Sequence, residues 1–178
     1  MFPIYAIVIA VPLGLLLGGH LASLGTVKVR WAPLAVLALA VQLVLFAPPV
    51  TRAIGDLGPL IYLASMAAVL VVVLANLRLP GVPLIAIGAA SNLLAILANG
   101  GYMPADPAAL ASLGRPAGAG YTNSVVLADP VFRPLTDIFV MPSWLPLANV
   151  FSIGDVLIGV GLAWAIVAAM RRPEPVTA

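Results

Sequence analysis

The sequence has no cysteine and only one histidine, His20. Without cysteine there is no disulfide framework, no thiolate nucleophile and no iron–sulfur cluster. One histidine supplies neither a bis-histidine haem nor a histidine-rich zinc site, and a single axial ligand to a pigment is the most that His20 offers. The P-loop, G-x-G-x-x-G, H-E-x-x-H and G-x-S-x-G motifs are also missing from the sequence. We therefore expect no cofactor and no metal, and we assign no catalytic residue.

Charged residues are scarce as well. They make up 8% of the 178 residues, against 63% hydrophobic residues, and the mean hydropathy is +1.17. So little polar surface cannot cover a water-soluble globule, and the composition indicates a membrane protein whose first partner is the lipid bilayer. The formal net charge of +2 is small and its residues are scattered, which argues against a nucleic-acid partner.

What the sequence does have is five long apolar stretches, each near the ~20 residues that cross a ~30 Å hydrocarbon layer. They predict an all-α fold, a single domain over residues 1–178 that forms an integral membrane helical bundle of about five transmembrane helices. The expected spans are about 2–19, 31–47, 60–77, 84–99 and 149–170. In the last span only 15 residues separate Asp155 from Arg171, a rise of roughly 22 Å. We therefore expect Asp155 at or inside the hydrocarbon boundary.

The connections carry most of the prolines and glycines. Residues 48–59 are predicted to be a turn-rich connection. Residues 100–147 hold seven prolines and five glycines and are predicted to be a long external loop without a long regular helix. Its second half, 125–147, is apolar and aromatic, so we expect it to lie on the headgroup layer or to re-enter the bundle. A short amphipathic helix is expected around residues 135–140.

Basic residues set the predicted orientation. Lys28, Arg30, Arg78, Arg171 and Arg172 fall in short connections or the tail on one side of the five spans, whereas Arg52, Arg115 and Arg133 are spread over two longer loops on the other. Short loops rich in lysine and arginine stay in the cytoplasm. The pattern predicts the N-terminus outside, the C-terminus inside and the long loop outside.

The fourth span carries a stripe of small and amide residues. Gly88, Asn92, Ala95 and Asn99 are spaced by four, three and four, so they share one helix face. An amide facing lipid would lack a hydrogen-bond partner, which predicts that this face packs inward. In one interpretation Asn92 bonds to a neighbouring helix while Asn99 and Gly100 close the helix end in a left-handed conformation. In the other, the amides line a polar cavity open to the outside.

Asp155 is the one acid expected within a span. With Gly159 and Ala163 it forms a second inward face, and an ionisable group at membrane depth is a candidate functional residue. The preceding Ser152 gives a different interpretation, because the spacing of Ser152 and Asp155 matches a capping box with Asp in place of Glu. Both interpretations remain open. No second carboxylate is expected in the spans to complete an acid/base pair.

Two polar signatures resemble a known family. They are Asn-Gly-Gly-Tyr-Met-Pro at 99–104 and Asn-Val-Phe-Ser-Ile-Gly-Asp-Val-Leu-Ile-Gly at 149–159, together with Gly18 and Gly19 before the first connection. The chain resembles an uncharacterised family of small bacterial multi-pass membrane proteins, a domain of unknown function. The resemblance covers nearly the whole chain and implies a bacterial plasma-membrane location, but it carries over no activity.

These observations predict a small membrane protein, more a non-catalytic subunit or binding module than an enzyme, with a polar pocket at the outer face between the last two spans and the 100–147 loop. Its partner would be another protein or a lipid-like small molecule, and Gly14/Gly18 and Gly159/Ala163 offer surfaces for homo-oligomers. The candidate ligand-binding residues are Asn92, Asn99, Tyr102, Trp144, Asn149, Ser152 and Asp155. One alternative is a small transporter or membrane-embedded enzyme that uses Asp155 as a proton or cation site. Another is a quinone or lipid-headgroup pocket framed by Tyr102, Trp144 and the asparagines.

Overall fold

The computed structural model describes residues 2–114 and 124–172, which are mostly helical. The α-helices are α1 (Phe2–Leu16), α2 (Ala32–Leu45), α3 (Pro48–Ile54), α4 (Gly58–Ala75), α5 (Val82–Ala98), α6 (Pro107–Ser112) and α7 (Ile153–Met170). The 3-10 turns are η1 (Leu21–Thr26), η2 (Gly55–Leu57) and η3 (Arg133–Leu135). Four two-residue strands are β1 (Met103–Pro104), β2 (Ser124–Val125), β3 (Phe139–Val140) and β4 (Val150–Phe151).

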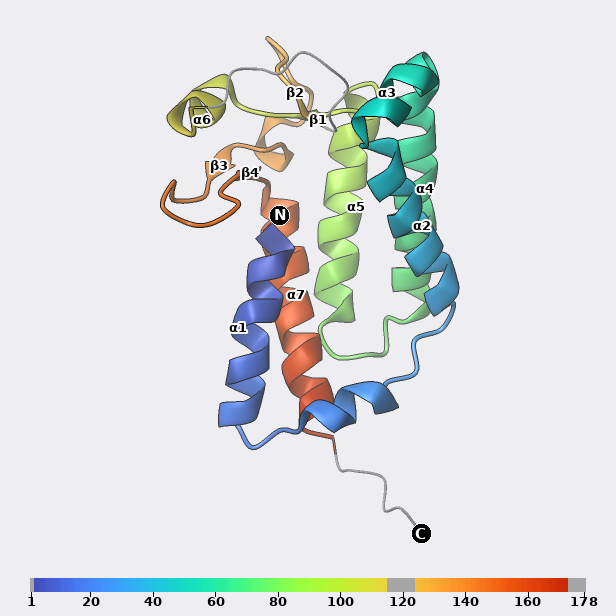
Figure 1. Cartoon of the computed structure of the whole chain (residues 1–178), viewed down its shortest axis with the longest axis vertical. Helices are drawn as coiled ribbons and strands as arrows, with labels where there is room; N and C mark the ends of the chain where they lie inside the picture. Colours follow the sequence, from blue (N-terminus) through green and yellow to red (C-terminus); the bar gives the residue numbers. More distant parts are fainter. Residues whose placement is uncertain (1, 115–123, 173–178) are drawn as a thin grey trace.

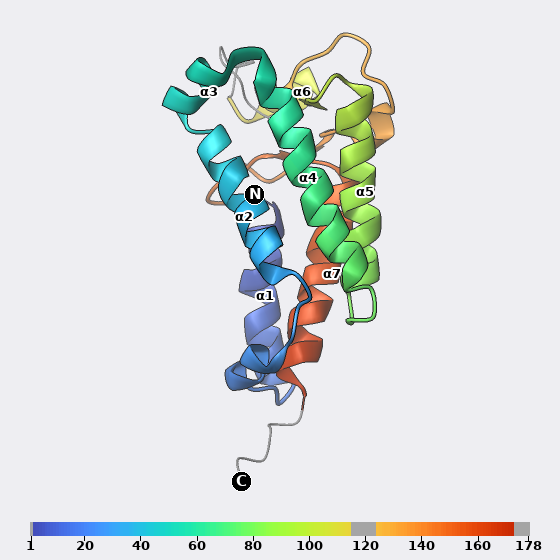
Figure 2. The same cartoon turned by 90° about the vertical axis from the view of Figure 1, so that its right-hand side faces the viewer.

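The five long helices run side by side (Figures 1 and 2). Helix α7 packs against both α1 and α5, and α4 packs against both α5 and α2. Residues 100–114 and 124–151, which we call the crown, cover one end of these helices. In the crown β1 pairs with β2 in parallel and β3 pairs with β4 antiparallel. The connection between α1 and α2, the turn between α4 and α5 and the end of α7 lie together at the opposite end, which we call the basic end.

Each of the five predicted apolar stretches overlaps most of one long helix, although α4 begins at Gly58 and α5 at Val82, two residues before the predicted stretches. Among the described helices, two are long and apolar enough to cross a membrane: Gly55–Ala75, which joins η2 and α4, and α7. Helices α1, α2 and α5 are apolar but shorter. The predicted start of the last span at residue 149 was too early, because α7 begins at Ile153 and Val150–Phe151 is strand β4.

Residues 48–59 connect α2 to α4 as predicted, but they are more helical than a turn-rich connection, because they form α3, η2 and the start of α4. Their prolines stand in the first turns of α3 and α4, where a missing N–H breaks no helical hydrogen bond. The amphipathic helix expected at 135–140 is absent: the η3 turn ends at Leu135, and Phe139 and Val140 pair with Phe151 and Val150 of β4. The 115–123 part of the predicted loop lies outside the described residues.

Glycines set how closely the helices approach. Gly81 and Gly88, at the start and in the middle of α5, lie against Gly161 and Gly154 of the antiparallel α7. A side chain at any of these four positions would collide with the facing backbone or side chain. The backbones of α5 and α7 are therefore in direct contact.

Two of the glycines expected to offer surfaces for homo-oligomers, Gly14 and Gly159, have neighbours within the chain. Gly14 lies against Met170 at the end of α7, and Gly159 lies against Phe2 of α1. A methyl group added at Gly18 would meet nothing within 4 Å. Gly18 has a φ of +77° and turns the chain after α1. Gly14 and Gly159 thus belong to the α1 and α7 interface.

Candidate functional site

Asn92, Ser152 and Asp155 form one hydrogen-bonded group, the polar junction, where α5 meets the start of α7. The Nδ2 of Asn92 donates to Oδ1 of Asp155 at 2.9 Å, and the Ser152 hydroxyl donates to Oδ1 of Asn92 at 2.8 Å. Asn92 and Ser152 are buried, with exposed fractions of 7% and 0%. The inward direction of the stripe is thereby confirmed for Gly88, Asn92 and Ala95, all of which are buried.

The start of α7 is a capping box, as the spacing of Ser152 and Asp155 predicted. The Asp155 amide donates to Oγ of Ser152 at 3.0 Å, and the Ser152 amide donates to Oδ2 of Asp155 at 3.3 Å. Both carboxylate oxygens of Asp155 therefore accept hydrogen bonds from within the junction. Such a closed network stabilises the contact between α5 and α7 and supplies a negative charge at the helix N-terminus.

Asn99 lies one turn above Ala95, outside the polar junction. Its Nδ2 donates to the carbonyls of Ala95 (2.7 Å) and Val131 (2.9 Å), and its Oδ1 accepts from the Val131 amide at 2.9 Å. Gly100 after it has a φ of +72°, so the predicted left-handed end of the helix is confirmed at Gly100, while Asn99 itself has a φ of −113°. Asn99 fastens the crown to the top of α5.

The other candidate residues lie in the crown. Tyr102 is half-buried just before β1, and Asn149 is half-buried before β4, where its carbonyl accepts from the Met141 amide at 3.0 Å. Trp144 is 79% exposed. The structure thus brings Asn92, Ser152 and Asp155 together, leaves Asn99 in a separate contact, and keeps the Trp144 indole at the surface.

Asp137 is a second buried acid that sequence reasoning missed. It is 7% exposed, its backbone amide donates to the Pro104 carbonyl, and its own carbonyl accepts from the Asp106 amide, both at 3.0 Å. Burial first and then the charge of Asp155 raise the pKa of its carboxyl, the amino terminus opposes the rise, and together they bring the pKa to about 7. The available signal was an acid within the apolar stretch 125–147.

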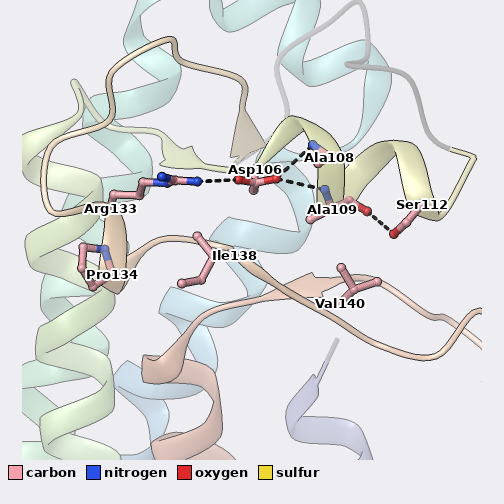
Figure 3. Close-up of a pocket in the computed structure, with 8 residues that line it drawn as sticks. All are labelled: Asp106, Ala108, Ala109, Ser112, Arg133, Pro134, Ile138 and Val140. Atoms are coloured by element: carbon pink, nitrogen blue, oxygen red, sulfur yellow. Dashed lines mark hydrogen bonds and ion pairs between the residues drawn. The ribbon is translucent and has the colours of Figure 1, made fainter.

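Sequence reasoning also missed a hollow in the crown. Asp106 caps α6 by accepting from the amides of Ala108 (2.9 Å) and Ala109 (3.0 Å), and it forms an ion pair with Arg133 at 3.2 Å. The Ala109 hydrogen bond and then the Arg133 guanidinium lower the pKa of the Asp106 carboxyl. Figure 3 shows this pair beside a hollow of about 580 Å³.

Apolar side chains form much of the wall of this hollow. Pro134, Ile138 and Val140 line it opposite α6, and the Ser112 hydroxyl donates to the Ala109 carbonyl at its far side (Figure 3). A second hollow of about 430 Å³ shares Asp106 and Arg133. The Arg133 side chain is 70% exposed and bonds Asp106 through one nitrogen, which leaves other N–H donors for a carboxylate or phosphate oxygen.

The fold and these contacts define a mostly helical protein with two helices long and apolar enough to cross a membrane, topped by a folded crown. A family model matches residues 26–167, from η1 through most of α7, and the chain belongs to that family, the family of unknown function DUF5317. The predicted membership of an uncharacterised family is thereby confirmed. Comparison with curated proteins and with solved structures gave no match.

Proposed function

We propose that this chain is a five-span bacterial plasma-membrane protein, N-terminus outside and C-terminus inside. It acts as a non-catalytic subunit or binding module that presents the crown to a partner. The observation that carries the binding role is the hollow of the crown, beside which Arg133 bonds Asp106 through one nitrogen and keeps its other donors free of hydrogen bonds to the described residues. The hydrogen-bonding groups of the polar junction, Asn92, Ser152 and Asp155, instead serve one another.

Exposed apolar side chains on the long helices support the membrane assignment. Ten large apolar side chains, each more than half exposed, are Val8, Ile9, Leu16, Val36, Leu37, Leu43, Leu60, Ile87, Leu97 and Trp164. Burial of apolar surface away from water stabilises a protein by roughly 25 cal/mol per Å². Soluble monomers therefore rarely leave so much apolar surface exposed to water. The shorter α1, α2 and α5 rise roughly 21–26 Å, so thinning of the bilayer or their apolar flanks would complete the span.

The distribution of charge supports the orientation. Lys28, Arg30, Arg78, Arg171 and Arg172 all lie at the basic end. Of the five aspartates of the described residues, Asp56 is in η2, Asp155 is in the first turn of α7, and Asp106, Asp129 and Asp137 are in the crown, so all five lie in elements at the end away from the basic end. By the positive-inside tendency the basic end faces the cytoplasm.

The absence of native cysteine allows a direct test by single-cysteine labelling in intact cells. Ser112→Cys in the crown should react with a membrane-impermeant maleimide, whereas Ala22→Cys near the basic end should react only after permeabilisation. Leu37→Cys is the matched control, because this 61% exposed position in α2 should stay unreactive in both conditions if it faces lipid. Labelling of Leu37→Cys in intact cells, or the reverse pattern at the two ends, would contradict the proposal.

The binding role has its own test at Arg133. Arg133→Gln removes the exposed cation of the crown hollow and its ion pair with Asp106, while leaving the contacts between the long helices in place. Crosslinking in intact cells through a photoreactive residue at Ser112 should give a discrete adduct that is lost in Arg133→Gln and kept in Arg171→Gln. An adduct unchanged by Arg133→Gln would show that the hollow is not the recognition site.

Asp137 favours a second candidate, a small transporter with a proton site. Its buried carboxyl has a pKa of about 7 and feels the charge of Asp155, so the crown supplies the second carboxylate that the spans lack. Proteoliposomes that show proton or cation flux lost in Asp137→Asn and Asp155→Asn would select this candidate. Flux absent from the native chain, or unchanged in both variants, would remove it.

A further inference from the structure

Three basic residues surround a hollow of about 490 Å³ at the basic end. Lys28 and Arg30 come from the connection before α2, and Arg78 comes from the turn after α4. Leu74 and Leu77 of the same wall are 49% and 42% exposed. Cations and uncovered apolar side chains thus lie side by side.

Asn76 holds these two connections together. Its Oδ1 accepts from the Arg30 amide at 2.8 Å, and its Nδ2 donates to the Arg30 carbonyl at 2.9 Å and to the Val72 carbonyl at 2.7 Å. Asn76 is buried, with an exposed fraction of only 7%. The backbone of Arg30 is therefore held beside the turn that carries Arg78, and the Arg30 guanidinium lies over the Trp31 ring at 5.8 Å from its centroid.

The positive charge of this hollow meets no acid among the described residues. The five aspartates there lie in elements at the end away from the basic end, and the one ion pair within residues 2–114 and 124–172 joins Arg133 to Asp106. The sequence's one glutamate, Glu174, lies outside the described residues. Cations that line one hollow without counter-charges among the described residues are suited to an anionic oxygen ligand.

We propose that this hollow binds the phosphate headgroup of an anionic phospholipid from the inner leaflet. Lys28, Arg30 and Arg78 contact the phosphate, and the acyl chains follow the exposed Leu74 and Leu77. The exposed leucines favour a lipid over free phosphate, because a phosphate ion would leave them uncovered. The assignment to the inner leaflet rests on the orientation proposed above, whereas the preference for an anionic headgroup follows from the residues that line the hollow.

Native mass spectrometry of the full chain in detergent, with equimolar phosphatidylglycerol and phosphatidylcholine, tests the inference. The native chain should retain phosphatidylglycerol preferentially. Each cation near a headgroup changes affinity roughly fivefold, so Lys28→Gln/Arg30→Gln/Arg78→Gln should lose on the order of 100-fold. Arg171→Gln, which removes one exposed cation outside the hollow, should retain the lipid, and Arg78→Lys should retain most of it.

Equal retention of the two lipids, or native retention by the triple variant, would overturn the inference. Displacement of the lipid by millimolar inorganic phosphate would show an ion site instead. A triple variant that fails to fold would shift the test to single glutamine variants, each expected to lose roughly fivefold. Cysteine labelling decides the membrane orientation separately, so reversed labelling with preserved lipid selectivity would overturn the orientation alone.

Discussion

Asn76 and Asn99 make the same contact at the ends of two different helices. Each donates to the carbonyl four residues earlier and also bonds both the amide and the carbonyl of one distant residue, Arg30 for Asn76 and Val131 for Asn99. An asparagine suits this role because its side chain offers both a donor and an acceptor. One residue thus closes a helix end and fastens a connection to it.

Asn99→Ala should loosen the crown. It removes three hydrogen bonds, at about 1 kcal/mol each at most for a half-buried site, so we expect a loss of about 1–3 kcal/mol. Hydrogen exchange should accelerate at Val131. Asn76→Ala is the matched control, since it should accelerate exchange at Arg30 and leave Val131 protected; equal effects of the two variants on Val131 would contradict the assignment.

Asn92→Ala should lower stability by about 2–3 kcal/mol, because it leaves Ser152 and Asp155 without their shared partner. The measurement is the melting temperature and the amount of folded protein in the membrane. Ser91→Ala serves as the control: its hydroxyl is buried without a partner in the described structure, so its loss should be neutral or stabilising. Normal melting of Asn92→Ala with lost function would assign the junction to binding or transport.

Asp137 predicts a dependence of stability on pH. Its pKa is about 7 in the folded chain against an ordinary 3.8, so folding favours the neutral acid. The contribution of this pKa shift to the free energy of unfolding is fully present below about pH 4 and is lost as the pH rises to about 7. It amounts to at most about 4 kcal/mol. Melting should occur at a lower temperature at pH 8 than at pH 5.

Asp137→Asn should remove most of this slope and raise the melting temperature at pH 8. Asp129→Asn, at an exposed position of the crown, provides the control and should leave the slope unchanged. A native chain equally stable at pH 5 and pH 8 would show that Asp137 ionises freely in the folded state.

Among the elements, the α5 and α7 pair organises the molecule. Glycines at seven-residue spacing on both helices, Gly81 and Gly88 against Gly161 and Gly154, bring the two backbones into contact. The same closeness places Asn92 within reach of Ser152. Close helix packing and the polar junction are therefore one structural feature.

Gly154→Ala should separate these helices. The added methyl group would overlap the Asn92 side chain and the Gly88 carbonyl, and overpacking of this kind costs about 1–3 kcal/mol or more. Thermal melting in detergent measures the loss. Gly25→Ala in η1, where an added methyl group meets nothing within 4 Å, should melt like the native chain; a similar loss in both variants would point to a backbone effect instead.

At the scale of the whole molecule, the charges of the described residues are divided between the two ends: the aspartates lie in η2, in the crown or in the first turn of α7, and five cations lie at the basic end. A helical bundle with exposed apolar sides and such polar ends matches the layers of a bilayer. The proposed orientation and the proposed lipid site both depend on the same cations.

Neutralising the basic end should weaken the orientation. Arg30→Gln/Arg78→Gln, introduced with the Ser112→Cys reporter, should give a population whose crown is no longer labelled in intact cells. Arg133→Gln at the crown end should leave labelling complete. Unchanged labelling in the double variant would mean that other features orient the chain.

Local patterns made part of this structure predictable. Hydropathy located five helices because an apolar run long enough to form a helix is a property of neighbouring residues. The capping box at Ser152 and Asp155 was predictable because its partners are three residues apart. Helical spacing likewise predicted that Asn92 lies on the inward face of its helix. The crown was not predictable from local patterns, because its strands pair residues that are distant in the sequence, Phe139 with Phe151 and Met103 with Ser124.

The sequence by itself determined the five long apolar helices, the capping box at the start of α7 and the inward face that carries Gly88 and Asn92, because these follow from interactions within a few residues. Only the tertiary structure decided what those faces meet: Asn92 with Asp155, Asn99 with Val131 and Asn76 with Arg30. It also decided that Asp137 is buried near Asp155. The physical reason is that hydrogen-bond partners and burial depend on residues that are distant along the chain and come together only when the helices pack.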